Sequence, residues 1–195
     1  MSATNRGALR ATNDFYATPT WLTEAIIPEL KQRLPAKPNI LEPAVGQGAM
    51  IDVLDAAFPD ATLLGLDIAD VPVKHTERFS IFDNTDFLAS EPSPEFDLIA
   101  TNPPFTLAQE FIEKALAFRR PRTDLNNREG LVVMLLRLNF LEGQRRAAWL
   151  RDLRPSVYIS PRRPSFTSDG QTDATGYGFF FFDGRGELHW LPTER

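Results

Sequence analysis

Short apolar runs alternate along the chain with segments whose apolar residues recur at helical spacing. The runs are rich in valine, isoleucine and leucine, which is typical of strands buried on both faces of a parallel sheet. The expected strands cover 39–43, 61–67, 79–82, 96–100, 131–136 and 157–159. The expected helices cover 19–30, 51–58, 107–118 and 145–153. Strands and helices that alternate in this order predict an α/β fold with a mostly parallel sheet.

Two turn signals refine this outline. Thr18 followed by Pro19 predicts a helix start, with Pro19 at the first helical position. Near the end of the chain, 177–182 and 187–191 flank the turn-forming residues 183–186. This pattern predicts an antiparallel C-terminal hairpin.

Length and composition fit one domain. The chain has 195 residues, of which 43% are hydrophobic, and this is enough for one full core. Residues 1–13 are polar and aperiodic, so we expect a flexible N-terminal segment followed by a single domain over 14–195. The polar stretch 160–176 predicts a loop of a length that is usually functional or disordered.

The residue types exclude several classes of protein. The chain has no cysteine, which excludes disulfides and thiolate metal sites, and His75 and His189 lie too far apart for a metal-ligand spacing. No apolar run reaches the ~18 residues of a membrane span, and no signal peptide opens the chain. We therefore expect a cytoplasmic protein with no metal and no membrane partner.

Charge is distributed unevenly along the chain. The net charge of −5 argues against indiscriminate binding to nucleic acids. From Arg119 to Arg163, however, eleven arginines stand against four acidic residues, a balance of +7. A basic half of an acidic protein can hold a polyanion locally, although the same residues also suit a solvated arginine-rich surface.

The most distinctive chemistry lies in Asn102-Pro103-Pro104-Phe105, just after an expected strand. Two prolines remove backbone donors and fix φ, so neither a central strand nor a helix continues through them. They form a rigid corner at the carboxyl end of a strand, where open α/β sheets bind ligands. The Asn102 side-chain oxygen and the Pro103 carbonyl could accept from an exocyclic amino group, and Phe105 could stack on a planar substrate. Taken alone, the four residues would also make a stiff turn.

A glycine loop follows the strand that ends in Glu42 and Pro43. Gly46 and Gly48 lie between this strand and a helix, where a ligand can approach the backbone. The third glycine of the dinucleotide fingerprint is absent, which disfavours a pyrophosphate ligand. Glu42 suits a ligand that carries an ammonium group.

Two further acidic residues follow expected strands. Asp67 comes about 20 residues after the glycine loop, the offset at which a carboxylate binds ribose hydroxyls in nucleoside-binding α/β folds. Asp86 could accept from a base amino group, with Phe87 against the face of the base. A turn with a buried Phe87 explains the second pair equally well. The glycine loop and Asp67 together predict a nucleoside site.

With these motifs in place, the chain resembles the class I S-adenosylmethionine-dependent methyltransferases. Within that group it is most similar to the DNA enzymes that methylate the exocyclic amino group (N6) of adenine, in particular the short type encoded by phages. The resemblance extends over nearly the whole chain after residue 13. It implies a Rossmann-like, doubly wound, mostly parallel seven-stranded sheet with helices on both faces.

The resemblance also implies roles for individual residues. The family's catalytic motif of Asp or Asn, two prolines and an aromatic residue matches Asn102, Pro103, Pro104 and Phe105. The cofactor would be S-adenosyl-L-methionine. Residues that match its binding motifs are Tyr16, Thr18, Pro19, Glu42, Pro43, Gly46, Gly48, Asp67, Ile68, Asp86 and Phe87.

The chain departs from this family in one respect. The branch with a Tyr-x-Thr-Pro segment, here 16–19, normally carries a separate target-recognition domain after the catalytic one, and this chain ends where that domain would begin. Recognition would then fall to the basic loops 137–146 and 160–176, to a specificity partner, or to nothing selective. The candidate nucleic-acid-binding residues are Arg137, Arg145, Arg146, Arg162 and Arg163.

The expected function is methyl transfer to the exocyclic amino group of adenine in double- or single-stranded DNA, in a host cytoplasm if the protein is encoded by a phage. In a duplex the target base would flip out of the stack. Methylation of guanine in RNA or of glutamine side chains in proteins keeps the same chemistry and remains open. So does a catalytically silent module that binds S-adenosylmethionine. A nucleotide-dependent oxidoreductase is a weaker alternative, because the proline corner has no role there.

Overall fold

Apolar residues that alternate within each strand divide the core into two clusters, one on each face of the sheet. In β5, Val133 and Leu135 belong to one cluster, whereas Val132 and Met134 belong to the other. This burial on both faces explains why the strands are continuous apolar runs. The computed structural model describes residues 17–70, 79–93, 95–122, 128–166, 172 and 174–192.

The described strands form one mixed sheet in the order β3-β2-β1-β4-β5-β7-β6-β8. Their bounds are β1 Asn39–Glu42, β2 Thr62–Leu66, β3 Phe79–Phe82, β4 Leu98–Thr101, β5 Leu131–Arg137, β6 Ser156–Ile159, β7 Tyr177–Phe181 and β8 Leu188–Trp190. β7 runs antiparallel to both of its neighbours, and every other pairing is parallel. The predicted α/β fold with a mostly parallel sheet is confirmed.

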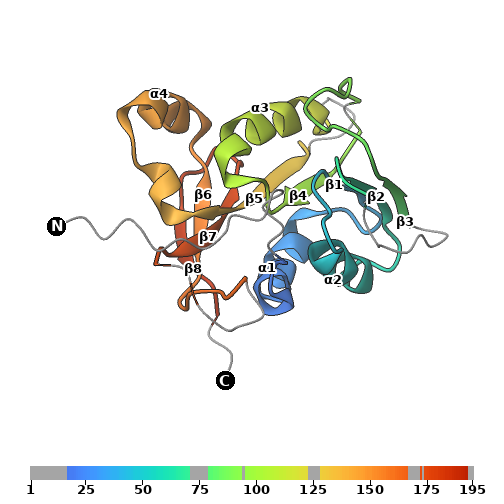
Figure 1. Cartoon of the computed structure of the whole chain (residues 1–195), viewed down its shortest axis with the longest axis horizontal. Helices are drawn as coiled ribbons and strands as arrows, with labels where there is room; N and C mark the ends of the chain where they lie inside the picture. Colours follow the sequence, from blue (N-terminus) through green and yellow to red (C-terminus); the bar gives the residue numbers. More distant parts are fainter. Residues whose placement is uncertain are drawn as a thin grey trace.

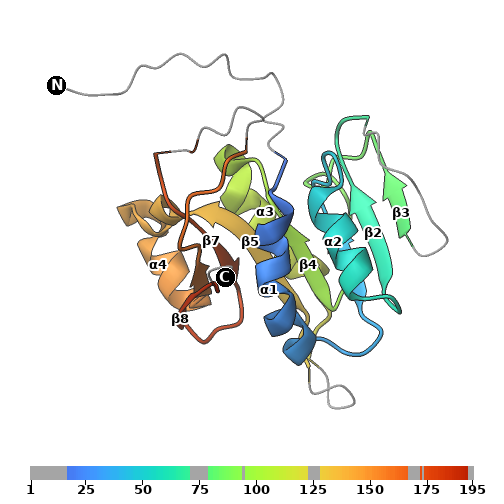
Figure 2. The same ribbon diagram turned by 90° about the horizontal axis from the view of Figure 1, so that it is seen from below.

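Helices cover both faces of the sheet (Figures 1 and 2). Their bounds are α1 Thr20–Arg33, α2 Ala49–Ala57, α3 Ala108–Phe118 and α4 Gln144–Leu153, with short 3₁₀ turns η1 Phe105–Leu107 and η2 Leu138–Leu141. The buried residues of α1 and α2 belong to one cluster, and those of α3 and α4 to the other. The result is the three-layer arrangement of a doubly wound fold.

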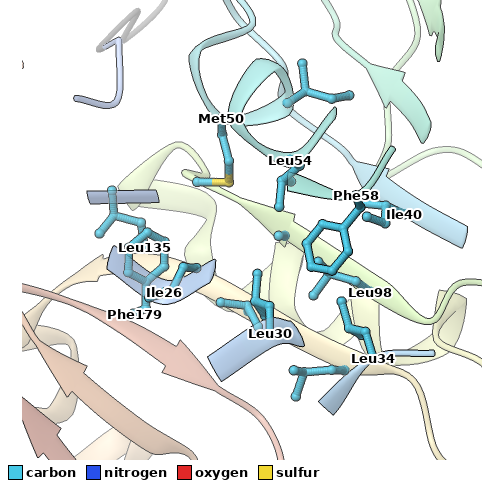
Figure 3. Packing of buried hydrophobic residues seen from close by; sticks show 14 of the residues in the cluster. Ile26, Leu30, Leu34, Ile40, Met50, Leu54, Phe58, Leu98, Leu135 and Phe179 are labelled. Carbon is cyan, nitrogen blue, oxygen red and sulfur yellow. The ribbon is translucent and has the colours of Figure 1, made fainter. Parts of the chain in front are cut away.

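The packing of α1 and α2 supports the strands that carry the site. Figure 3 shows Ile26 and Leu30 of α1 among side chains of the sheet such as Leu98 and Leu135, with Leu54 of α2 close by. These residues are at most 1% exposed. Both helices therefore hold the middle of the sheet in place.

The expected C-terminal hairpin is wrong, and the described part of the sheet has eight strands rather than seven. β7 does not pair with β8, because its two edges are already taken by β5 and β6. The chain crosses instead to the far side of β6, where Val157 N–H donates to the carbonyl of Glu187 at 2.8 Å. β8 then adds to β6 in parallel.

The N-terminal helix begins slightly later than expected. α1 starts at Thr20, Pro19 is its cap residue, and no side chain caps it. Thr18 is therefore not a helix cap, and its hydroxyl has another partner described below. Residues 1–13 and Tyr16 lie outside the described residues. None of the described helices is both long and apolar enough to span a bilayer.

Candidate functional site

The glycine loop and the proline corner lie at the same edge of the sheet because β1 and β4 are parallel neighbours. Leu41 of β1 pairs with Ile99 of β4. The chain passes from β1 to β2 and β3 on one side and reaches β4 and β5 on the other. The carboxyl ends of β1 and β4 thus flank the point where the strand order reverses, which is the usual ligand site of such sheets.

The glycine loop depends on backbone conformations that other residues rarely adopt. Gly46 has a φ of 55° and Gly48, which precedes α2, has a φ of 84°. The Gly46 N–H donates to Oδ2 of Asp67 at 2.8 Å, and the Val45 N–H donates to the carbonyl of Leu66 at 3.1 Å. These bonds hold the loop against the end of β2.

Asp67 connects three segments of the site and is only 7% exposed. Its Oδ1 accepts from the N–H of Ala69 at 2.9 Å, while Oδ2 accepts from Gly46. Its backbone N–H donates to the carbonyl of Phe82 at the end of β3, and its carbonyl accepts from the N–H of Thr85 just after that strand. An ionised carboxylate has about four acceptor positions, so Asp67 can hold the loop and still accept from ribose hydroxyls.

A cavity of about 340 Å³ opens between the end of β2 and the proline corner. Predicted site residues that line it are Pro43, Asp67, Ile68, Asp86, Phe87, Asn102 and Pro104. Ile68 is 69% exposed at this cavity. The structure therefore brings together residues from four separate motifs around one cavity.

Asp86 and Phe87 differ in how they meet this cavity. Asp86 is exposed, and its Oδ1 accepts from the N–H of Leu88 at 2.9 Å. Phe87 is 2% exposed, and its ring contacts Phe111 and Phe118 with centroids 5.4 and 5.1 Å away. The ring thus belongs to the core, as in the alternative interpretation of a turn with a buried Phe87, although the residue also lines the cavity.

Glu42 is buried beside a second, smaller cavity of about 40 Å³. It is 2% exposed, and among the described residues its Oε2 has no hydrogen-bond partner. Burial, followed by the charges of Asp52 and Asp67, raises the pKa of Glu42 well above its usual range. A buried carboxyl with an unsatisfied oxygen at a cavity wall is an acceptor site for a cationic ligand.

Asn102 lines both cavities. Its Nδ2 donates to Oγ1 of Thr18 at 3.1 Å, and Thr18 is 6% exposed. The segment before α1 thus contacts the proline corner directly. Pro19 precedes α1 and does not line either cavity among the described residues.

Other side chains of the protein contact the Phe105 ring. The Arg137 guanidinium lies over the Phe105 ring, with Cζ 4.7 Å from the centroid. The Nε of Arg137 also donates to the hydroxyl of Tyr177 at 3.1 Å. Tyr177 in turn packs against Phe105 at a centroid distance of 5.8 Å. Stacking of a substrate on Phe105 therefore has to accommodate Arg137.

A third cavity of about 190 Å³ lies beside Phe105. Its lining includes Phe105, Arg137, Asn139, Phe140 and Arg146. Two of the arginines expected to bind nucleic acid, Arg137 and Arg146, therefore lie next to the proline corner.

The other predicted arginines lie elsewhere on the surface. Arg145 and Arg163 are exposed. Arg162 lies over the ring of Trp21, with Cζ 3.9 Å from the centroid. None of these three lines the cavities described above.

Several residues that line the cavities belong to none of the motifs found in the sequence. Thr85, Leu88, Leu107 and Phe111 are among the residues that line the large cavity, and Phe140 lines the third. Their common feature is that they follow the carboxyl ends of β3, β4 and β5. The position after a parallel strand was therefore the available signal, although it does not identify which side chain faces inward.

Comparison with known proteins gives matches in structure alone. No family model matches the chain, and no curated protein matches its sequence. A modification subunit assigned to a type I restriction enzyme of Vibrio vulnificus has a TM-score of 0.64 at 14% identity, over 96% of this chain and 49% of that one. This chain thus spans about half the length of that subunit.

Two other solved structures are similar over most of the chain. A protein described as a hemolysin from Lactococcus lactis has a TM-score of 0.60 at 14% identity, over 89% of this chain and 92% of that one. A dimethyladenosine transferase from Plasmodium falciparum has a TM-score of 0.57 at 15% identity, over 85% of this chain and 62% of that one. At such identities, the likeness establishes a shared fold.

Proposed function

We propose that this protein transfers a methyl group from S-adenosylmethionine to the exocyclic amino group of adenine in DNA. The observation that carries the proposal is that Asn102 lines both the large and the small cavity. An amine held by this side chain would lie next to any ligand that spans the two cavities. This is the arrangement that transfer between a bound donor and a bound acceptor requires.

The residues around the two cavities fit the parts of S-adenosylmethionine. The large cavity offers the exposed Ile68 to an adenine ring, and Asp67 and Asp86 as acceptors for ribose hydroxyls and a base amino group. The small cavity offers Glu42, whose buried oxygen suits an ammonium group. The ammonium group, the ribose hydroxyls and the base amino group of the cofactor thus each have a chemically matched side chain.

The proline corner supplies acceptors to an amine that is otherwise a poor nucleophile. Bound S-adenosylmethionine would supply a methyl group on a positively charged sulfur. The Asn102 oxygen and the Pro103 carbonyl would accept from the two hydrogens of the amine, which favours a pyramidal nitrogen and stabilises the positive charge that develops on it. The extra proton can leave to water after the methyl has arrived, so no strong general base is needed at the corner.

Two observations support a nucleic-acid base as the methyl acceptor, namely the arginines beside the proline corner and the names of two similar structures. Arg137 and Arg146 line the cavity beside Phe105, in the basic half of the chain. Two of the similar structures are named a restriction-enzyme modification subunit and a dimethyladenosine transferase. Guanine in RNA and glutamine side chains in proteins carry the same kind of weakly nucleophilic amino nitrogen, so they are the alternative acceptors that the test has to distinguish.

The test is transfer of labelled methyl from S-adenosylmethionine to DNA, RNA and protein mixtures, followed by mass spectrometry of the digested nucleosides. We expect N6-methyladenine in DNA. We also expect Asn102→Ala to abolish transfer while cofactor binding measured by calorimetry persists. Label that appears only in RNA guanine or in protein would refute the proposed substrate. Full turnover by Asn102→Ala would refute the role of the corner.

A further inference from the structure

The cavity beside Phe105 combines two cations from different parts of the chain. Arg137 is the last residue of β5, and Arg146 lies in the first turn of α4. The described residues that line this cavity of about 190 Å³ include no acidic side chain. The two cations therefore lie in the wall of one cavity.

Each guanidinium lies over an aromatic ring of the same cavity. The Cζ of Arg137 lies 4.7 Å from the centroid of Phe105, and the Cζ of Arg146 lies 4.6 Å from that of Phe140. Stacking uses the face of a guanidinium, whereas its N–H groups donate from the edge. The two rings thus restrict where the two guanidinium groups can lie.

Hydrogen bonds fix both side chains further. Arg137 donates from Nε to the hydroxyl of Tyr177 at 3.1 Å. Arg146 donates to the carbonyls of Phe140 and Glu142 at 3.2 and 3.0 Å. Because their rotamers are already restricted, these arginines would lose little further freedom when an anion binds.

We propose that this cavity binds a phosphodiester group of a nucleic-acid substrate, next to the nucleotide whose base enters the proline corner. This inference rests on the proposed function, and it assigns the substrate class of that site. The planar fork of arginine matches phosphate oxygens in pairs. The cavity shares Phe105 with the corner, so an anion bound there would belong to the backbone beside the target base. A glutamine side chain in a protein carries no such anion.

The test compares Arg137→Met and Arg146→Met with Arg151→Met. Methionine keeps an apolar stem against the ring and removes the charge, and Arg151 is an exposed arginine of the same helix as Arg146. Binding of a fluorescent DNA oligonucleotide and of RNA of the same sequence would be measured over a range of salt, with S-adenosylhomocysteine present.

We expect each cavity variant to bind about tenfold more weakly. We also expect the slope of log K against log salt to shrink by roughly 0.9 for duplex DNA or 0.7 for single strands, as for one lost phosphate contact. Arg151→Met should match the wild type. Arg137→Lys should recover the salt slope without full affinity, because it restores the charge but not the planar fork.

Wild-type affinity and salt slope in both methionine variants would overturn the phosphate site. So would an equal loss of methyl transfer to a glutamine-containing peptide and to DNA. These outcomes differ from failure of the proposed function, which would appear in the wild type as no binding of S-adenosylmethionine or no methyl transfer. A smaller slope of log K against log salt in the variants would support the phosphate site even if the wild type transferred no methyl group.

Discussion

The amide of Asn102 donates from Nδ2 to Oγ1 of Thr18 at 3.1 Å, across 84 residues of sequence. An amide that donates at one end can only accept at the other. In the proposed reaction, the bond with Thr18 would therefore present the Asn102 oxygen to the incoming amine. The proposed function thus gives Thr18 the role of a positioning residue for the proline corner.

We expect Thr18→Val to lower kcat for methyl transfer roughly five- to tenfold, since it removes a hydrogen bond of about 1 kcal/mol that orients the amide. KM for the nucleic acid should change little. Steady-state kinetics would separate the two constants. Thr18→Ser keeps the hydroxyl and should retain most of the rate, and an unimpaired Thr18→Val enzyme would disprove the positioning role.

Glu42→Gln tests the ammonium site. The substitution keeps the size of the side chain but cannot ionise, so it removes the negative charge that Glu42 would acquire by releasing its proton beside a cationic ligand at the small cavity. We expect the affinity for S-adenosylmethionine to fall at least tenfold, as measured by calorimetry. Exposed Glu24 of the neighbouring helix offers a matched control, because Glu24→Gln should bind the cofactor normally.

The same variant should be more stable than the wild type when no ligand is bound. Burial, and then the charges of Asp52 and Asp67, raise the pKa of Glu42, so the folded chain retains a proton that the unfolded chain releases. Stability from this residue therefore falls as pH rises above the ordinary value near 4.3. Glu42→Gln should raise Tm at pH 7, by ~2–4 °C for each kcal/mol relieved, and should not raise it near pH 4. Equal Tm values at both pH values would contradict this expectation.

Asp183 should stabilise the end of the sheet that lies away from the site. Burial alone would raise its pKa, but hydrogen bonds from Arg33, the Arg185 N–H and Ser156 lower the pKa below its usual range. We expect Asp183→Asn to cost about 1.5–3 kcal/mol, typical of hydrogen bonds to a charged group. The contribution is present above the unfolded pKa near 3.9 and is lost as pH falls through the folded value.

Thermal unfolding of both proteins between pH 3 and 8 would check this behaviour. The gap in Tm between wild type and Asp183→Asn should be constant at neutral pH and should narrow in acid. Glu187→Gln is a suitable control, because the Glu187 side chain is 48% exposed and, among the ion pairs of the described residues, contacts only the partly exposed ring of His189. A gap that persists unchanged at pH 3 would show that packing, rather than charge, accounts for the loss.

Ile68→Ala should separate binding from stability. The side chain is 69% exposed at the large cavity, so its removal should leave Tm within about 1 °C of the wild type. Affinity for S-adenosylmethionine should fall about fivefold, because the adenine ring loses an apolar contact. Leu188 of β8 is 63% exposed and does not line this cavity, and Leu188→Ala should bind the cofactor as the wild type does.

The strands and the edge that carries the cavities were predictable from sequence, because burial on both faces leaves unbroken apolar runs such as Leu131–Leu136. The position of β8 in the sheet was not predictable from the sequence. Local turn chemistry at 183–186 favours a hairpin, whereas pairing depends on which edge is vacant, and β5 and β6 occupy both edges of β7. Which strand edge remains unpaired is decided only when the whole sheet is assembled.

Contacts between distant segments account for the other differences at the site. Thr18 before a proline is typical of a helix cap, but its hydroxyl meets Asn102. Arg137 was expected at a nucleic-acid surface, and its contact with Phe105 depends on β4 and β5 being neighbours. Residue type and spacing identified these positions, whereas their partners follow only from the tertiary arrangement.

Asp67 has a structural role at this site in addition to its proposed role toward the cofactor. Its carboxylate ties the glycine loop to the end of β2 through hydrogen bonds within the protein. A related protein without activity would still need an acidic residue at position 67 to hold the glycine loop. The presence of an acidic residue at this position in a related sequence would therefore indicate the same loop structure, and substitution of Asp67 would disturb the loop as well as any ligand that it holds.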